Sequence, residues 1–164
     1  MRDKIINTNK FTSIILLTDF SIIARNALNY AISAFENGVS YTLVNAYDAR
    51  TSTATLLNLN DVLRKESEQK LKEEKEWIKS EYPEYKLDLV SHSIFGSPVD
   101  AIKELVNKKK SDLVVMGTKG ITGIEAVLFG SVAVAVIKAG IVPVISVPPD
   151  YNFLGLKEII YASD

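Results

Sequence analysis

The sequence predicts an α/β protein with an open five-stranded parallel sheet of order 3-2-1-4-5 and helices on both faces. Two observations lead to this prediction: short apolar runs alternate with amphipathic stretches, and Gly, Pro, Ser and Asn residues mark the changes between them. Alternating strands and helices imply βαβ units with right-handed crossovers, and therefore a parallel sheet. The first and fourth strands are then neighbours where the winding reverses, and open α/β sheets bind ligands at that point.

Five short apolar runs are expected to form the strands of this sheet. Each run contains Ile, Leu or Val residues, and polar or turn-forming residues flank it. The predicted strands are Ser13–Thr18, Tyr41–Ala46, Lys86–Ser93, Leu113–Met116 and Val142–Val147.

Four helices are expected to follow the first four strands, because each intervening stretch carries helix start or stop signals. The segment from Asp48 to Asn58 lacks a clear period and is predicted to be a loop. The predicted helices run from the N-cap Ser21 to Asn37-Gly38, from about Asp61 to Ser80, from Ser97-Pro98 to about Lys108, and from Val132 to Ala139.

Composition limits the possible functions. The 164 residues, 47% apolar and 24% charged, are typical of one globular domain. A net charge of −1 provides no basic surface for nucleic acid or an anionic membrane. The absence of cysteine excludes disulfides, thiolate catalysis and cysteine zinc sites. No run reaches the roughly 18 apolar residues of a membrane span, and a cytoplasmic protein is expected.

A glycine-rich run follows the fourth predicted strand, with the spacing Gly117-x2-Gly120-x9-Gly130-Ser131. Glycine permits positive φ angles and a close approach of the backbone to a ligand. Ser131 is expected to N-cap the next helix, whose free N–H groups and positive dipole end attract anions. The run contains no evident base or nucleophile, so it indicates a site that holds phosphates.

Thr18-Asp19 follows the first strand and is expected to lie beside the glycine-rich run, because the first and fourth strands are neighbours. Two features distant in sequence therefore point to one crevice. Structural interpretations remain open for both: Asp19 could cap the first helix alongside Ser21, and glycines after a strand often form only a turn.

These residues resemble the universal stress protein family from Phe11 to Val147. The spaced glycines are similar to the motif of the ATP-binding branch, which has a Rossmann-like fold. Two departures stand out: Leu17 replaces a usual proline, and Asn45 and Ala46 replace the usual His and Val. The resemblance rests on Leu17-Thr18-Asp19-Phe20-Ser21, Leu43-Val44-Asn45-Ala46, Phe95-Gly96-Ser97-Pro98 and Gly117-x2-Gly120-x9-Gly130-Ser131.

The resemblance implies a site for ATP with Mg²⁺. Asp19 would approach the ribose or the metal–phosphate region, and Ala46 would present backbone groups to adenine. The glycines would line the path of the ribose and phosphates, and backbone N–H groups at the start of the last helix would hold phosphates that Mg²⁺ bridges. The implied site residues are Thr18, Asp19, Ala46, Met116, Gly117, Gly120, Gly130, Ser131 and Val132.

Three functions stay open at this point: an ATP-binding stress-response regulator, a slow ATP hydrolase or self-phosphorylating protein, and an interaction module with a degenerate site. The first is favoured because the sequence has no Walker-A lysine motif, no Gly-x-Ser-x-Gly elbow and no evident base partner for Asp19. No catalytic or metal-ligating side chain is therefore assigned. The single histidine, His92, lies within a predicted strand and is expected to be packed.

The predicted last strand is an apolar edge, and such edges need covering. The resemblance implies pairing of two such strands, in a homodimer or in a pseudo-dimer within one chain. The segment from Leu156 to Asp164 echoes that from Thr12 to Asp19, which predicts an internal repeat. The expected organisation is a nucleotide-binding domain over residues 1–149, a linker over 150–157, and the first strand of a truncated second domain over 158–164.

The long second helix is expected to carry structural residues. Trp77 is expected to pack in the core with Tyr82 and Tyr85. Three glutamates of this helix have lysines three or four positions away and are expected on the surface, where a metal site is not expected. They are Glu73, Glu74 and Glu76.

Overall fold

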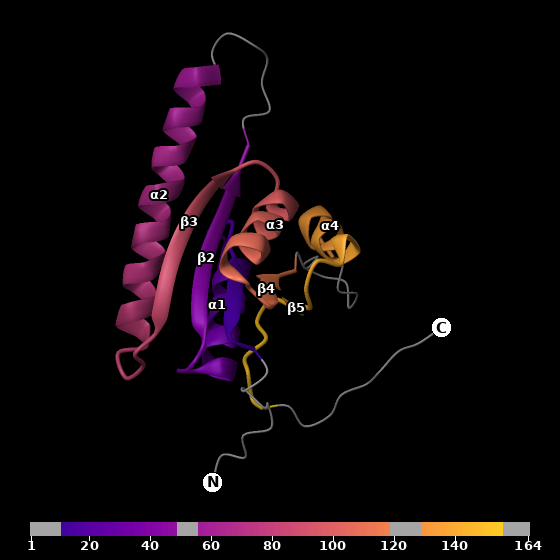
Figure 1. Ribbon diagram of the computed structural model, residues 1–164. Coiled ribbons are helices and arrows are strands. Elements are labelled where there is room, and N and C mark those ends of the chain that lie inside the picture. The colour runs from indigo at the N-terminus through magenta and orange to yellow at the C-terminus, as the bar shows by residue number, and fades with distance from the viewer. Residues whose placement is uncertain (1–10, 49–55, 119–128, 156–164) are drawn as a thin grey trace.

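The computed structural model describes residues 11–48, 56–118 and 129–155. Within these ranges the chain forms one sheet of five strands in the order β3-β2-β1-β4-β5. Every neighbouring pair is parallel, as the strand–helix alternation predicts. Figure 1 shows α3 and α4 together in front of the sheet and the long α2 beside β3.

The elements alternate strictly along the chain. The strands are β1 Ser13–Leu17, β2 Ser40–Tyr47, β3 Asp88–Phe95, β4 Leu113–Gly117 and β5 Val144–Val147. The helices are α1 Ile22–Phe35, α2 Leu56–Glu81, α3 Pro98–Lys109 and α4 Ser131–Ala139.

Two apolar cores hold the layers together, one on each face of the sheet. Successive side chains of a strand point to opposite faces. Thus Ile14 and Leu16 of β1 pack with α1 and α2, whereas Ile15 and Leu17 pack with α3 and α4. These four side chains are at most 7% exposed, and each contributes about 1.5–3 kcal/mol through its burial. The central strand is therefore fixed on both faces, which gives the site a rigid base.

Several local predictions were wrong at the ends of elements, and the third strand, predicted over Lys86–Ser93, lies at Asp88–Phe95. Helix α2 begins at Leu56, so the last residues of the predicted loop are helical. Strand β5 begins at Val144, after Pro143; proline lacks the N–H that a ladder needs. Gly130, and not Ser131, is the N-cap of α4, and Ser131 is its first residue.

The side chains of α2 and of the segment after it confirm one prediction and correct another. Trp77, Tyr82 and Tyr85 pack partly buried against the core, as expected. Glu74, however, is not a surface residue: its side chain is 3% exposed and forms a two-pronged ion pair with Arg25 of α1. The Arg25 guanidinium also lies 4.4 Å from the centre of the Trp77 ring, so this group ties α1 to α2.

The segment after β5 lies against α1. The Asn26 side chain donates hydrogen bonds to the carbonyls of Pro148 and Tyr151. The Tyr30 ring contacts the rings of Tyr151 and Phe153. The predicted strand over 158–164 lies outside the described residues and stays a prediction. Among the described helices, none is long and apolar enough to cross a membrane.

Candidate functional site

The carboxyl ends of β1 and β4 lie side by side. Leu17 is in register with Met116 across this parallel pair, and both are buried. The next residues, Thr18 after β1 and Gly117 at the end of β4, are therefore neighbours at this end of the sheet. Thr18 is buried, whereas Asp19 is exposed. The structure thus brings Thr18, Asp19 and the start of the glycine-rich run to one edge of the sheet.

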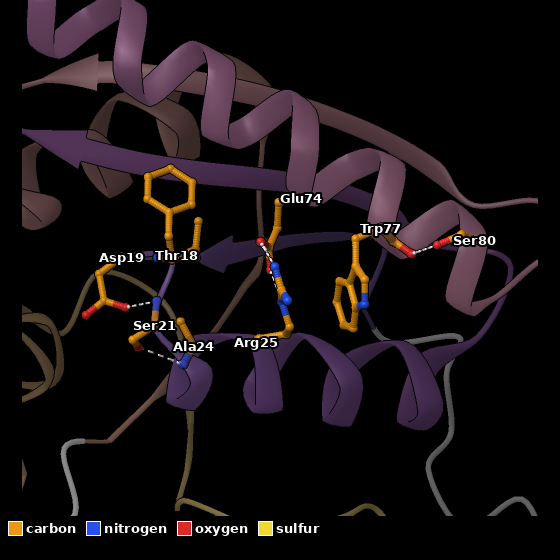
Figure 2. A network of polar contacts seen from close by, with 9 residues as sticks. Thr18, Asp19, Ser21, Ala24, Arg25, Glu74, Trp77 and Ser80 are labelled. Carbon is orange, nitrogen blue, oxygen red and sulfur yellow. Dashed lines mark hydrogen bonds and ion pairs between the residues drawn. The ribbon is translucent and has the colours of Figure 1, made fainter.

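A tight turn connects β1 to α1 and sets the direction of Asp19. The Thr18 hydroxyl accepts a hydrogen bond from the Phe20 N–H at 2.9 Å, and Asp19 Oδ1 accepts from the Ser21 N–H at 3.0 Å. Ser21 in turn caps α1 by accepting from the Ala24 N–H. Figure 2 shows the second carboxylate oxygen of Asp19 pointing away from this turn. Asp19 therefore supports the helix start and still presents an oxygen to solvent.

Phe20, in the same turn, has a φ of 65°. An aromatic side chain in this left-handed region is uncommon, and such backbone strain costs about 1–3 kcal/mol. Strain of this kind persists only where surrounding contacts impose it, and it is concentrated at functional sites. The turn that carries Asp19 is held in a specific shape.

A buried polar chain lies beneath this turn. The Asn45 amide nitrogen donates to the Thr18 carbonyl at 2.8 Å, and its Oδ1 accepts from the Ser67 hydroxyl at 2.8 Å. The Ser93 hydroxyl donates to that of Ser67 at 2.7 Å. The chain joins β3, α2, β2 and the end of β1. The sequence offered one signal for it, an Asn at the end of an apolar strand, but its partners are distant in sequence and were not predicted.

Gly117 is required by packing. A β carbon at this position would lie 2.8 Å from Cγ2 of Ile23 and 2.9 Å from its carbonyl oxygen. Its φ is not positive, and neither is that of Gly130, which is −64°. The expectation that these two glycines serve positive φ angles was therefore wrong. Gly117 does permit a close approach of its backbone, but the group that approaches it is Ile23 in the first turn of α1 and not a ligand.

Within the described residues, no side chain caps the N–H groups at the N-terminus of α4. The first N–H groups of a helix have no acceptor within the helix, and Gly130 has no side chain to accept from them. In α1 and α3, by contrast, Ser21 and Ser97 accept from the first turn. Ser131 and Val132 are exposed. As far as the described residues show, the positive end of α4 is therefore available to an anion, even though Ser131 is not its cap.

Two predicted site residues lie apart from this turn or outside the described residues. Ala46 lies near the end of β2, half-buried. Gly120 lies outside the described residues. The described part of the chain holds no cluster of three His, Asp or Glu residues able to hold a metal.

The model of the universal stress protein family matches residues 10–148. This chain belongs to that family. Universal stress protein MJ0531 from Methanocaldococcus jannaschii is 30% identical over 145 residues, which cover 85% of this chain and 83% of the relative. The family assignment agrees with the strand order found here.

Solved structures agree with the fold. That of hypothetical protein MJ0577 is 26% identical, has a TM-score of 0.68, and aligns over 87% of this chain and 99% of its own. A universal stress protein in complex with cAMP is 24% identical, with a TM-score of 0.54, over 84% of this chain and 97% of its own. A family member from Arabidopsis thaliana with AMP bound is 17% identical, with a TM-score of 0.50, over 84% and 91%.

Proposed function

We propose that this universal stress protein binds an adenine nucleotide, and specifically ATP with Mg²⁺, at the carboxyl ends of β1 and β4. One observation carries the proposal: Asp19 lies just after β1 and Gly117 ends β4, and these two strands are in register at Leu17 and Met116. This is the point of an open α/β sheet where the chain winds in opposite directions and ligands bind. The helix that follows β4 supplies the open N-terminus.

Each part of the nucleotide has a matching group. The N–H groups at Gly130, Ser131 and Val132 suit phosphate oxygens. The free oxygen of Asp19 suits a ribose hydroxyl or a hydrated cation. Mg²⁺ commonly binds through one or two carboxylates together with substrate phosphates and water, so the Asp19 carboxylate fits it. Backbone groups near Ala46 suit the edge of adenine.

The two relatives with bound cAMP and AMP support an adenine nucleotide as the ligand class. ATP and Mg²⁺ go beyond those relatives and rest on the open helix N-terminus and on Asp19. The proposed role is regulatory: the protein would hold the nucleotide and change its interactions accordingly. A catalytic role would require a positioned nucleophile and groups that stabilise charge on the transferred phosphoryl.

Calorimetry with ATP, ADP, AMP and cAMP, each with and without Mg²⁺, tests the proposal. Gly130 has a φ of −64° and a ψ of 158°, which other residues adopt without strain. Gly130→Val should therefore fold and place a branched side chain where phosphate would approach. We expect it to lose ATP binding. Ala139→Val adds a side chain at the exposed far end of α4 and should bind as the wild type does.

Unchanged ATP affinity in folded Gly130→Val would contradict the assignment of the phosphate site. A preference for cAMP or AMP over ATP would retain the ligand class and refute ATP as the ligand. Phosphate release at about 1 s⁻¹ or faster, which is in the range of ordinary enzymes, would favour the hydrolase alternative if Asp19→Asn abolished it.

A further inference from the structure

The end of β1 is held by a side chain of the neighbouring strand. We name the buried chain Thr18 carbonyl–Asn45–Ser67–Ser93 the Asn45 network. Asn45 is 8% exposed and Ser67 is 3% exposed. In such surroundings an amide or hydroxyl is costly unless it is hydrogen-bonded, and both ends of the Asn45 amide are bonded here. The network is thus a fixed part of the fold.

Chemistry allows Asn45 only one orientation. The Thr18 carbonyl can only accept a hydrogen bond, so the Asn45 nitrogen has to face it. Oδ1 then faces α2, where the Ser67 hydroxyl donates to it. Ser67 is left to accept from Ser93 of β3. Each group donates to the next in one direction, from the edge strand to the end of β1.

This arrangement fixes the peptide that joins Thr18 to Asp19. The Thr18 N–H donates to the Val44 carbonyl at 2.9 Å, and the Thr18 carbonyl accepts from the adjacent Asn45 side chain. Strand β2 therefore holds Thr18 at both of its backbone polar groups. The next residue is the exposed Asp19, and the one after it is the strained Phe20. A displaced Thr18 carbonyl would rotate the whole turn.

We propose that Asn45 is a positioning residue of the nucleotide site: through the Thr18 carbonyl it sets the direction of the Asp19 carboxylate. Ser67 supports Asn45 and so connects α2 to the same turn. The inference rests on the proposed function, because it assigns Asp19 a contact with the ligand. It assigns Asn45 no contact of its own with the nucleotide.

A double-mutant cycle tests this inference by calorimetry with ATP and Mg²⁺. Asn45→Leu keeps the size of the side chain and removes its donor, and Asp19→Ala removes the carboxylate. We expect each single variant to bind about tenfold more weakly, a loss on the scale of one hydrogen bond to a charged group. If Asn45 acts through Asp19, the double variant should bind no more weakly than Asp19→Ala alone. A purely structural effect of Asn45 would instead add to the loss at Asp19.

Hydrogen exchange gives a second readout that needs no nucleotide. The Phe20 N–H donates to the Thr18 hydroxyl, and its exchange should be faster in Asn45→Leu than in the wild type. Tyr82→Phe is the matched control, because it removes a partly buried hydrogen bond to Asn29 away from the site. In Tyr82→Phe, the hydrogen-exchange rate of the Phe20 N–H and the affinity for ATP should equal those of the wild type. If Asn45→Leu does not fold, Ser67→Ala takes its place in both measurements and should show smaller changes of the same kind.

The outcomes separate the two proposals. A wild type that binds none of the nucleotides refutes the proposed function and, with it, the role of Asn45. A wild type that binds ATP, with unchanged affinity in a folded Asn45→Leu, refutes only the role of Asn45. Additive losses in the double variant do the same. Unchanged exchange at Phe20 would show that Asn45 does not hold the turn.

Discussion

Gly117 at the end of β4 and Ile23 in the first turn of α1 lie so close that a β carbon on Gly117 would meet Ile23 at 2.8 Å. The contact joins β4, which ends at the first glycine of the glycine-rich run, to α1, which begins three residues after Asp19. It keeps the two sides of the proposed site together, because α1 cannot move away from β4 without losing this packing. The glycine has a structural reason to be there, independent of any ligand.

Gly117→Ala should destabilise the fold by about 1–3 kcal/mol, the usual cost of overpacking. The added carbon would contact both the side chain and the carbonyl oxygen of Ile23. Ile23→Ala in the same chain should recover only part of the loss, because the carbonyl oxygen remains. Urea unfolding of the two single variants and the double variant measures this. A Gly117→Ala variant as stable as the wild type would show that α1 can shift at no cost.

The ion pair between Arg25 and Glu74 leads to a second prediction. Arg25→Leu should destabilise the protein by about 2 kcal/mol, less than the 3–5 kcal/mol of a fully buried pair, because the Arg25 side chain is 43% exposed. The loss arises from leaving the buried Glu74 carboxylate without its partner. Adding Glu74→Leu should restore most of the stability. Urea unfolding distinguishes this from a simple packing loss, in which the second substitution would add to the first.

His92 should make stability depend on pH. Burial lowers the pKa of His92 below its usual value, and the nearby Lys109 and Lys108 act in the same direction against Glu104. The folded state therefore resists protonation, and the unfolded chain takes up a proton first. The contribution is fully present above about pH 6.5, the unperturbed value, and is lost as pH falls toward the lowered pKa.

Urea midpoints between pH 8 and pH 5 measure this dependence. His92→Gln should lose less stability over that interval than the wild type. The contributions of carboxylates to the pH dependence are the same in the wild type and the variant, so they cancel in the comparison. Since His92 is the single histidine, its ring resonances report the pKa directly by NMR. A pKa of His92 at or above 6.5 by NMR would contradict the prediction. So would equal pH dependence of stability in the wild type and His92→Gln.

The strand order could be predicted because periodicity and turn signals are local, and the order follows from the rules for crossovers. The helix ends were less predictable. Ser131 looked like an N-cap because serine accepts well there, yet Gly130 has the extended backbone of the cap and Ser131 is already helical.

The contacts that shape the candidate site could not be predicted in this way. Ile23 explains Gly117, and Ser67 orients Asn45, but each pair joins residues that only the folded chain brings together. Glu74 was misplaced for the same reason. Its spacing to lysines is typical of a solvated helix face, and the partner that buries it is Arg25 of another helix.

The open edge of β5 has a defined set of donors. The Pro143 and Val147 carbonyls accept from Val114 and Thr118 on the β4 side. Because the directions of backbone groups alternate along a strand, the N–H groups of Val144 and Ser146 point away from β4. In the described part of the chain β5 pairs with β4 alone. These two donors are therefore available to a second strand.

We predict that two chains pair through β5, edge to edge. Ser146→Pro should weaken this assembly, because it removes an outward N–H and leaves the hydrogen bonds to β4 in place. Ser146→Ala removes the hydroxyl but keeps the donor, so it should assemble as the wild type does. Light scattering over a range of concentrations measures the mass of each variant, and circular dichroism checks its fold. A wild type that stays monomeric at all concentrations, or a folded Ser146→Pro that assembles as tightly as Ser146→Ala, would show that the β5 edge is not the contact.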